Sequence, residues 1–235
     1  MTMLISAALF FLLLHLLVAG TRVRDAIVGA IGERPYLGLF SLASLGGIVW
    51  LAISYNAVSR AGSDLIWDLG PGVAHLGIVV VGLAFLLGVP GLLSPNPTAV
   101  MQGETAVLDG IVQGVLRITR HPFLWGVALW AGFHLLANGD QASIIFFGTF
   151  FVLAVAGTYS IDAKRARKMG AAWQAFAKTT SNIPFAAIVA GRNSLKVGEL
   201  LSYRLVIALI VFLVVLFAHK WLFSASPFPG GWSPY

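Results

Sequence analysis

Residues 2–20 read TMLISAALFFLLLHLLVAG, an apolar run in which His15 is the only ionisable side chain. About 20 apolar residues in a helix cross the ~30 Å hydrocarbon core of a bilayer. No Lys or Arg precedes the run, although a secretory signal peptide needs a basic segment there. The stretch therefore predicts a transmembrane helix over residues 2–22 rather than a cleaved signal.

Five further apolar runs follow along the chain and predict spans near residues 36–55, 71–93, 123–137, 143–161 and 203–223. Hydrophobic residues make up 58% of the chain and charged residues only 10%, whereas soluble domains are about 25% charged. These features predict one all-α domain over residues 1–235, a polytopic transmembrane helix bundle of about six spans. The short connections leave no room for a large extramembrane domain.

Three connecting segments have their own patterns. A short helical connector is expected from Asp25 to Gly32. Apolar residues alternate with cations at helical spacing between Asp162 and Lys178, which predicts either a helix in the membrane interface or a solvated helix. The tail from Ser224 to Tyr235 contains prolines and glycines and is expected to be an irregular cap.

The 15 Lys and Arg residues are distributed unevenly between the two sides of the predicted bundle. Thirteen of them fall in the first, third and fifth connections, and only Arg60 and Lys220 fall on the other side. Cytoplasmic loops of membrane proteins are rich in Lys and Arg, so the odd-numbered connections are expected to be cytoplasmic, as in a bacterial inner membrane protein. Topology and contacts with membrane lipids explain the net charge of +6 without a nucleic-acid partner.

The histidines are the main candidate ligands because the chain has no cysteine and therefore no thiolate or disulfide chemistry. His15 and His134 lie inside predicted spans, where an ionisable residue is a functional hypothesis by default. Each is either a structural interhelical hydrogen-bonding group or an axial ligand of haem iron. His75 is either a further ligand or a core hydrogen-bonding group, and His219 is expected to reach the interface.

Two polar residues are placed to assist such a site. Arg22 follows His15 by seven residues, which puts both on one helix face about 10 Å apart and within reach of a haem propionate. Asn138 follows His134 by one turn and is expected to orient a group in the pocket. A separate pair, Arg120 and His121, precedes Pro122 at a helix start and is either an interfacial anchor or part of a binding site.

Several short motifs together resemble one known family. They are His15 with Arg22, Ile31-Gly32-Glu33-Arg34-Pro35-Tyr36, Leu39-Phe40-Ser41-Leu42, Arg117-Ile118-Thr119-Arg120-His121-Pro122, Trp125-Gly126, Leu129-Trp130, His134 and Asn138-Gly139. The chain resembles the NnrU family, which includes bacterial proteins associated with denitrification genes and is similar to plant and cyanobacterial 15-cis-zeta-carotene isomerase, a membrane haem b enzyme.

This resemblance implies haem b as cofactor, with His15 and His134 as the two histidine ligands. It implies isomerisation or redox handling of a hydrophobic or lipid-like substrate, or a role in nitric oxide and denitrification metabolism. Ala131 stands where the isomerase has a cysteine thought to exchange with one ligand, so a thiolate switch is excluded in this chain.

Two alternative functions remain open from the sequence. Arg120-His121-Pro122 also resembles a segment of isoprenylcysteine and phospholipid methyltransferases that helps to bind S-adenosylmethionine, but residues 162–167 lack the paired glutamates of those enzymes. The second alternative is a non-catalytic membrane protein that transports a molecule or supports assembly of a partner.

Overall fold

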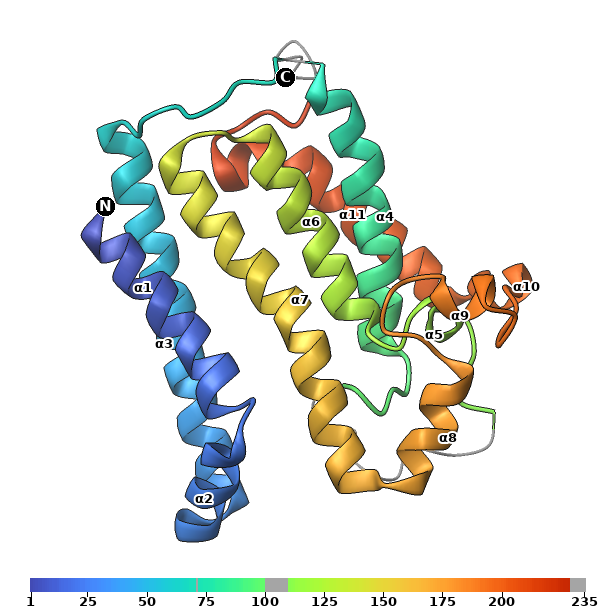
Figure 1. Cartoon of the computed structure of the whole chain (residues 1–235). Coiled ribbons are helices and arrows are strands. Elements are labelled where there is room, and N and C mark those ends of the chain that lie inside the picture. Colours follow the sequence, from blue (N-terminus) through green and yellow to red (C-terminus); the bar gives the residue numbers. More distant parts are fainter. Residues whose placement is uncertain (71, 100–109, 229–235) are drawn as a thin grey trace.

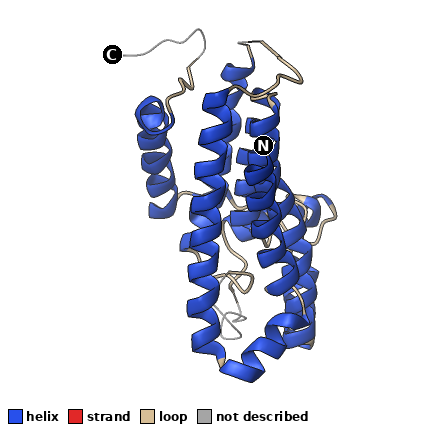
Figure 2. Cartoon of the chain, turned by 90° about the vertical axis from the view of Figure 1, so that its left-hand side faces the viewer, coloured by secondary structure: helices blue, strands red, loops and turns tan. Residues whose placement is uncertain are grey.

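The computed structural model describes residues 1–70, 72–99 and 110–228, and these residues form a helical bundle without a named strand (Figures 1 and 2). The helices in chain order are α1 (Thr2–Leu13), the π-helix η1 (Leu14–Val18), α2 (Arg22–Ile31), α3 (Glu33–Ala61), α4 (Val73–Leu93), α5 (Val115–Ile118), α6 (Pro122–Ala137), α7 (Gln141–Met169), α8 (Ala171–Thr179), α9 (Ala186–Val189), α10 (Val197–Leu200) and α11 (Tyr203–Phe223). The prediction of an all-α bundle is confirmed.

The long helices are arranged side by side, as Figure 1 shows. The pair α1 and α3 packs against α7, α7 packs against α6, α6 against α4, and α4 against α11. The short helices α5, α9 and α10 lie together near the first residues of α6, beside α8. The polar segments of the chain therefore gather at one end of the bundle and the apolar helices form its body.

Six apolar helices occupy the positions that the sequence predicts, but their lengths differ. Four of them, α3, α4, α7 and α11, are long and apolar enough to cross a membrane, and α1–η1 with α2 forms a fifth candidate that is bent by 79°. At 16 residues, α6 is shorter. The helix α3 extends beyond the predicted range of 36–55 at both ends.

The prediction of a separate interfacial helix from Asp162 to Lys178 is wrong at its beginning. Helix α7 continues without a break to Met169, and the chain then turns at Gly170, which has a φ of +52°. Glycine adopts such a positive φ without steric cost, so the turn separates α7 from α8. The connector after the first apolar run is helical as predicted, although it begins at Arg22 rather than Asp25.

Small residues allow α4 and α6 to approach closely. A Cβ atom added at Gly126 would lie 2.7 Å from the backbone oxygen of Ala84 and 2.8 Å from Cα of Gly88. Lipid tails are as apolar as the side chains of a membrane helix, so the hydrophobic effect does not drive helices together there. Small residues favour helix packing in membranes because they let the two backbones approach closely. The contact fixes the position of α6, which carries His134.

Candidate functional site

His15 lies in the π-helix between α1 and the bend of the chain. Its Nδ1 is 2.8 Å from the carbonyl oxygen of Phe11, so the ring proton belongs on Nδ1, and Nε2 accepts a hydrogen bond from the Ser44 hydroxyl at 3.1 Å. Segments of π-helix occur frequently at functional sites. The imidazole thus presents Nε2, the nitrogen that carries a lone pair, toward α3.

The bend corrects one prediction about this region. Arg22 does not share a helix face with His15, because the helix containing His15 ends at Val18 and α2 leaves at a bend of 79°. The turn includes Gly20, where an added Cβ atom would lie 2.4 Å from the oxygen of Leu16 and 2.6 Å from Oγ of Ser160. Arg22 instead lines a pocket with side chains of α7.

His134 lies near the C-terminal end of α6. Its Nδ1 donates to the carbonyl oxygen of Trp130 at 2.8 Å, and its ring stacks on Phe147 of α7 with the centroids 4.8 Å apart. No hydrogen bond from another residue in the described ranges reaches its Nε2. Asn138, predicted to orient a group in the pocket, instead ends α6 by donating from Nδ2 to the His134 carbonyl oxygen at 2.8 Å.

Both histidines have the donor chemistry that haem iron requires. In each ring a backbone carbonyl holds the Nδ1 proton, which leaves the lone pair on Nε2, as in metal-binding histidines whose second nitrogen is fixed by a hydrogen bond. Their surroundings are aromatic and apolar, with Phe11 and Phe40 beside His15 and Phe133 and Phe147 beside His134. Each histidine therefore fits the role of an axial ligand.

The two rings are not brought together, however. Aromatic rings lie between them. The ring centroids of Phe11 and Phe150 are 5.9 Å apart, and those of Phe150 and Trp130 are 5.7 Å apart. Phe150 belongs to α7 and contacts both the helix that precedes His15 and the helix that carries His134.

The remaining histidines lie elsewhere. His75 is exposed at the first turn of α4, with Nδ1 3.4 Å from the Gly72 oxygen, so it is not the core group that was expected. His219 is partly buried, and its Nδ1 donates to the Ala225 oxygen at 2.8 Å. Of the predicted C-terminal cap, Ser224 to Phe228 are non-helical, and residues 229–235 lie outside the described residues.

Arg120 and His121 form a buried network with Asp162 of α7. Arg120 donates from Nε and Nη2 to the two carboxylate oxygens at 2.8 and 2.5 Å, and His121 Nε2 lies 2.7 Å from Oδ1. Asn182 donates to the same carboxylate at 3.0 Å. The side chains of Arg120 and Asp162 are only 14% and 17% exposed, so the ion pair is shielded from water.

The His121 side chain is fully buried, and this burial lowers its pKa despite the opposing effect of Asp162. The neutral ring donates from Nε2 to Asp162, which leaves Nδ1 as an acceptor. His121 Nδ1 and Asn182 Oδ1 are buried and have no hydrogen-bond partner among the described atoms. His121 thus lies inside the fold, with one ring nitrogen bonded to Asp162 and the other without a partner among the described residues.

Neighbouring residues of the motif Arg117–Pro122 hold the loops that follow α8. Arg117 makes a two-point ion pair with Glu199, at 2.7 and 2.9 Å, and also donates to Asn193. Thr119 donates to the carbonyl oxygen of Asn182. Because Arg120 and His121 are committed to Asp162, the contacts assign this motif a role within the protein and none of them favours the methyltransferase alternative.

Sequence reasoning missed Asp162 as the partner of Arg120 and His121. The available signal was its isolation, because it is the only carboxylate between Gln141 and Met169. An ionisable residue next to an apolar run often pairs with another polar group. Lys164, Arg167 and Lys168 were also missed as neighbours of Arg22 in one pocket, because the predicted helix boundary at Asp162 separated them from the span.

The sequence of this chain is similar to those of known proteins. The family model described as NnrU protein matches residues 3–227. The chain is 30% identical over 211 residues to the 15-cis-zeta-carotene isomerase of Arabidopsis thaliana, covering 87% of this chain and 56% of that protein. It is 27% identical over 175 residues to the protein of the same name from Zea mays, covering 74% of this chain and 47% of that protein.

The chain thus spans about half the length of these two plant relatives. No solved structure matches it. The family model covers both histidine-bearing helices, the buried Arg120–Asp162 network and the cation-lined pocket. On this match, which extends over nearly the whole chain, the protein belongs to the NnrU family.

Proposed function

We propose that this protein is a membrane isomerase that converts a cis double bond of a hydrophobic polyene to the trans form, with haem b as its cofactor. The observation that carries the proposal is the agreement between the NnrU family match and two plant relatives that bear the name 15-cis-zeta-carotene isomerase. A carotenoid-like polyene is the substrate class that these names suggest.

The aromatic side chains between the two histidines support a polyene as substrate. Trp130 contacts Phe147 and Phe150 edge to face, and Phe146 contacts the same two phenylalanines. Flat aromatic surfaces bury large apolar area and pack well against a planar conjugated chain. The cluster has no charged side chain, so it favours a hydrocarbon over a polar substrate.

His15 and His134 are the proposed iron ligands because their hydrogen-bonded Nδ1 atoms leave Nε2 as the donor. Haem iron, when bound, would supply a redox-active centre that no side chain of this protein can replace. The protein's own contribution would be to hold the two imidazoles in one tautomer and to exclude water through the surrounding phenylalanines. Ala131, fully buried, has no thiol to compete with either ligand.

We also propose that the odd-numbered connections face the cytoplasm of a bacterial cell. The cations of these connections lie in α2, at the start of α3, in the last turns of α7, in the segments around α5, α8 and α10, and at the start of α11. The asymmetry of Lys and Arg supports this orientation. We further propose a physiological context in denitrification, which the resemblance to NnrU proteins implies.

The activity can be tested in a bacterial strain that accumulates 15-cis-zeta-carotene in the dark. Chromatography of extracted carotenoids should show conversion of the 15-cis isomer when the wild-type protein is produced, and loss of conversion in His15→Ala and His134→Ala. His75→Ala is the matched control, because His75 is exposed at the first turn of α4. Wild-type protein that is present in the membrane but converts none of the isomer would refute this substrate.

A further inference from the structure

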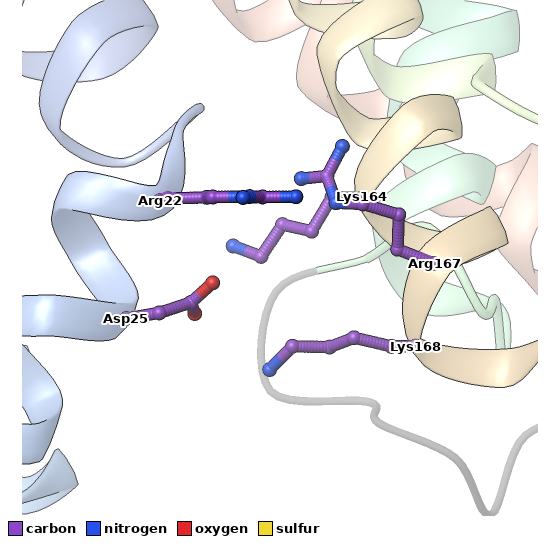
Figure 3. A pocket seen from close by; sticks show the side chains of 5 residues that line it. All are labelled: Arg22, Asp25, Lys164, Arg167 and Lys168. Atoms are coloured by element: carbon purple, nitrogen blue, oxygen red, sulfur yellow. The ribbon is translucent and has the colours of Figure 1, made fainter.

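A pocket of about 300 Å³ lies between α2 and the C-terminal part of α7. Arg22 and Asp25 line it from α2, and Lys164, Arg167 and Lys168 line it from α7. Figure 3 shows these side chains extending from the two helices toward one another. Four cations and a single carboxylate thus share one small space.

Within the described residues, most cations of the pocket lack an opposing charge. Arg22, Arg167 and Lys168 make no ion pair or hydrogen bond within the part of the chain that the structure describes. Lys164 donates from Nζ only to the Ala19 oxygen at 3.4 Å, and the ion pair of Asp25 is with Arg24, at 3.5 Å. Like charges that line one pocket repel one another, and an anion bound between them would offset this repulsion.

The position of the pocket indicates where its ligand comes from. Arg22 follows the first apolar segment immediately after the bend, and Lys164 follows the apolar part of α7. Both helices therefore supply their cations at the point where the apolar length ends, which is the depth of lipid headgroups in a bilayer. The pocket opens at this boundary rather than inside the bundle.

We propose that this pocket binds a phosphate group, held either on the headgroup of an anionic membrane lipid or as a free phosphate ion. A phosphomonoester carries up to two negative charges and several oxygen acceptors, which match two guanidinium groups and two ammonium groups. The carboxylate of Asp25 repels an anion beside it, so the phosphate lies on the α7 side, near Lys164, Arg167 and Lys168. This site is independent of the proposed isomerase activity.

The test uses the purified full-length chain in a neutral detergent at one fixed salt concentration. Calorimetric titrations with short-chain phosphatidic acid, with phosphatidylcholine of equal chain length and with inorganic phosphate distinguish the two sources. The pocket variant is Arg22→Gln with Lys164→Gln. The matched control is Arg34→Gln with Lys178→Gln, which removes the same charge from the same predicted side of the membrane but outside the pocket.

Phosphatidic acid should bind the wild type more tightly than phosphatidylcholine does, and the pocket variant should lose about tenfold or more in affinity. The control should stay within about twofold of the wild type, because cations outside the pocket act only through the screened surface potential. If inorganic phosphate displaces phosphatidic acid, the ligand is a free phosphate ion. If inorganic phosphate does not displace phosphatidic acid, the ligand is the lipid headgroup. Both results support a phosphate site.

Equal affinity of the wild type and the pocket variant would overturn the proposal, as would an equal loss in the control. Visible absorbance of the same samples provides a separate readout for haem. A pocket variant that loses a haem band while keeping its affinity for phosphatidic acid would mean that these cations serve a porphyrin carboxylate, and the phosphate proposal would be wrong. Absence of haem from every sample would leave the phosphate result intact.

Discussion

At the scale of single residues, Asp162 connects α7 to the loop before α6. It accepts hydrogen bonds from Arg120, His121 and Asn182 in a region shielded from water. Removing one member of a buried ion pair leaves the other charge without compensation, which costs more than the pair itself contributes. The network is therefore expected to be among the most sensitive polar positions in the protein.

Asp162→Ala should destabilise the folded protein by about 3 kcal/mol because it leaves Arg120 buried and unpaired. The apparent melting temperature in detergent, followed by tryptophan fluorescence, measures this loss. Asp25→Ala is the control, since the Asp25 side chain is 53% exposed and its ion pair is long, and exposed pairs contribute about 0–1 kcal/mol. Similar losses in the two variants would contradict the structural role of Asp162.

Glu199 provides a pH-dependent contribution to stability. Its hydrogen bonds with Arg117 lower its pKa from 4.5 to about 2 in the folded protein. The pKa of Glu199 is lower in the folded than in the unfolded protein. The stabilisation is therefore fully present above pH 4.5 and is lost as the pH falls toward 2. Melting temperatures between pH 6 and pH 3 should fall more steeply for the wild type than for Glu199→Gln, and identical slopes would argue against this pair.

The sequence identified the functional candidates better than their partners. His15 and His134 stand out because an ionisable residue is rare within an apolar run. The pairing of Arg120 with Asp162 spans 42 positions, and no periodicity in one sequence encodes such a contact. The prediction that Arg22 and His15 share a helix face was wrong, because the π-helix and the turn at Gly20 interrupt the helical spacing on which the prediction depended.

At the scale of helices, the approach of α4 and α6 depends on the absence of a side chain at Gly126. Gly126→Ala should destabilise the protein by about 1–3 kcal/mol, because its Cβ atom would meet backbone atoms that cannot move aside as a side chain can. Gly46→Ala in α3 has open space around the added methyl group and should be neutral or slightly stabilising. Yield and melting temperature of the two variants measure the difference.

Helix positions could be predicted from sequence because apolar length and the scarcity of charge determine them. Helix ends were predicted less well. Helix α7 extends eight residues beyond the predicted end at Ile161, since the basic residues that follow are good helix formers and Asp162 is paired within the fold. The 79° bend lies at the break between η1 and α2, and hydrophobic patterning carries no signal for it.

At the scale of the whole molecule, the bundle places its cations and its aromatic cluster in different regions. The cation-lined pocket lies at the ends of α2 and α7, whereas Phe146, Phe147 and Phe150 lie in the first half of α7. This separation gives the protein an apolar interior for a hydrophobic ligand and a charged end for polar groups. The orientation of the bundle in the membrane can therefore test the topology predicted from the distribution of Lys and Arg.

Single-cysteine labelling can determine this orientation because the natural chain has no cysteine to interfere. Ser194→Cys, in the connection between α7 and α11, should react with a membrane-impermeant maleimide only after permeabilisation of spheroplasts. Ala61→Cys, at the end of α3, should react in intact spheroplasts. Both positions are exposed in the folded protein. The opposite labelling pattern would mean that the positive-inside rule does not set this topology.

The absorption spectrum of protein purified after haem-replete expression tests the proposed haem ligation by His15 and His134 most directly. The wild type should show the Soret band of haem b, and His15→Ala and His134→Ala should each lose it or shift it, since each removes one axial ligand. His75→Ala, which replaces an exposed histidine, should retain the wild-type spectrum. A wild-type protein with no Soret band, or a band unchanged in both His15→Ala and His134→Ala, would contradict the assignment of these two histidines to haem iron.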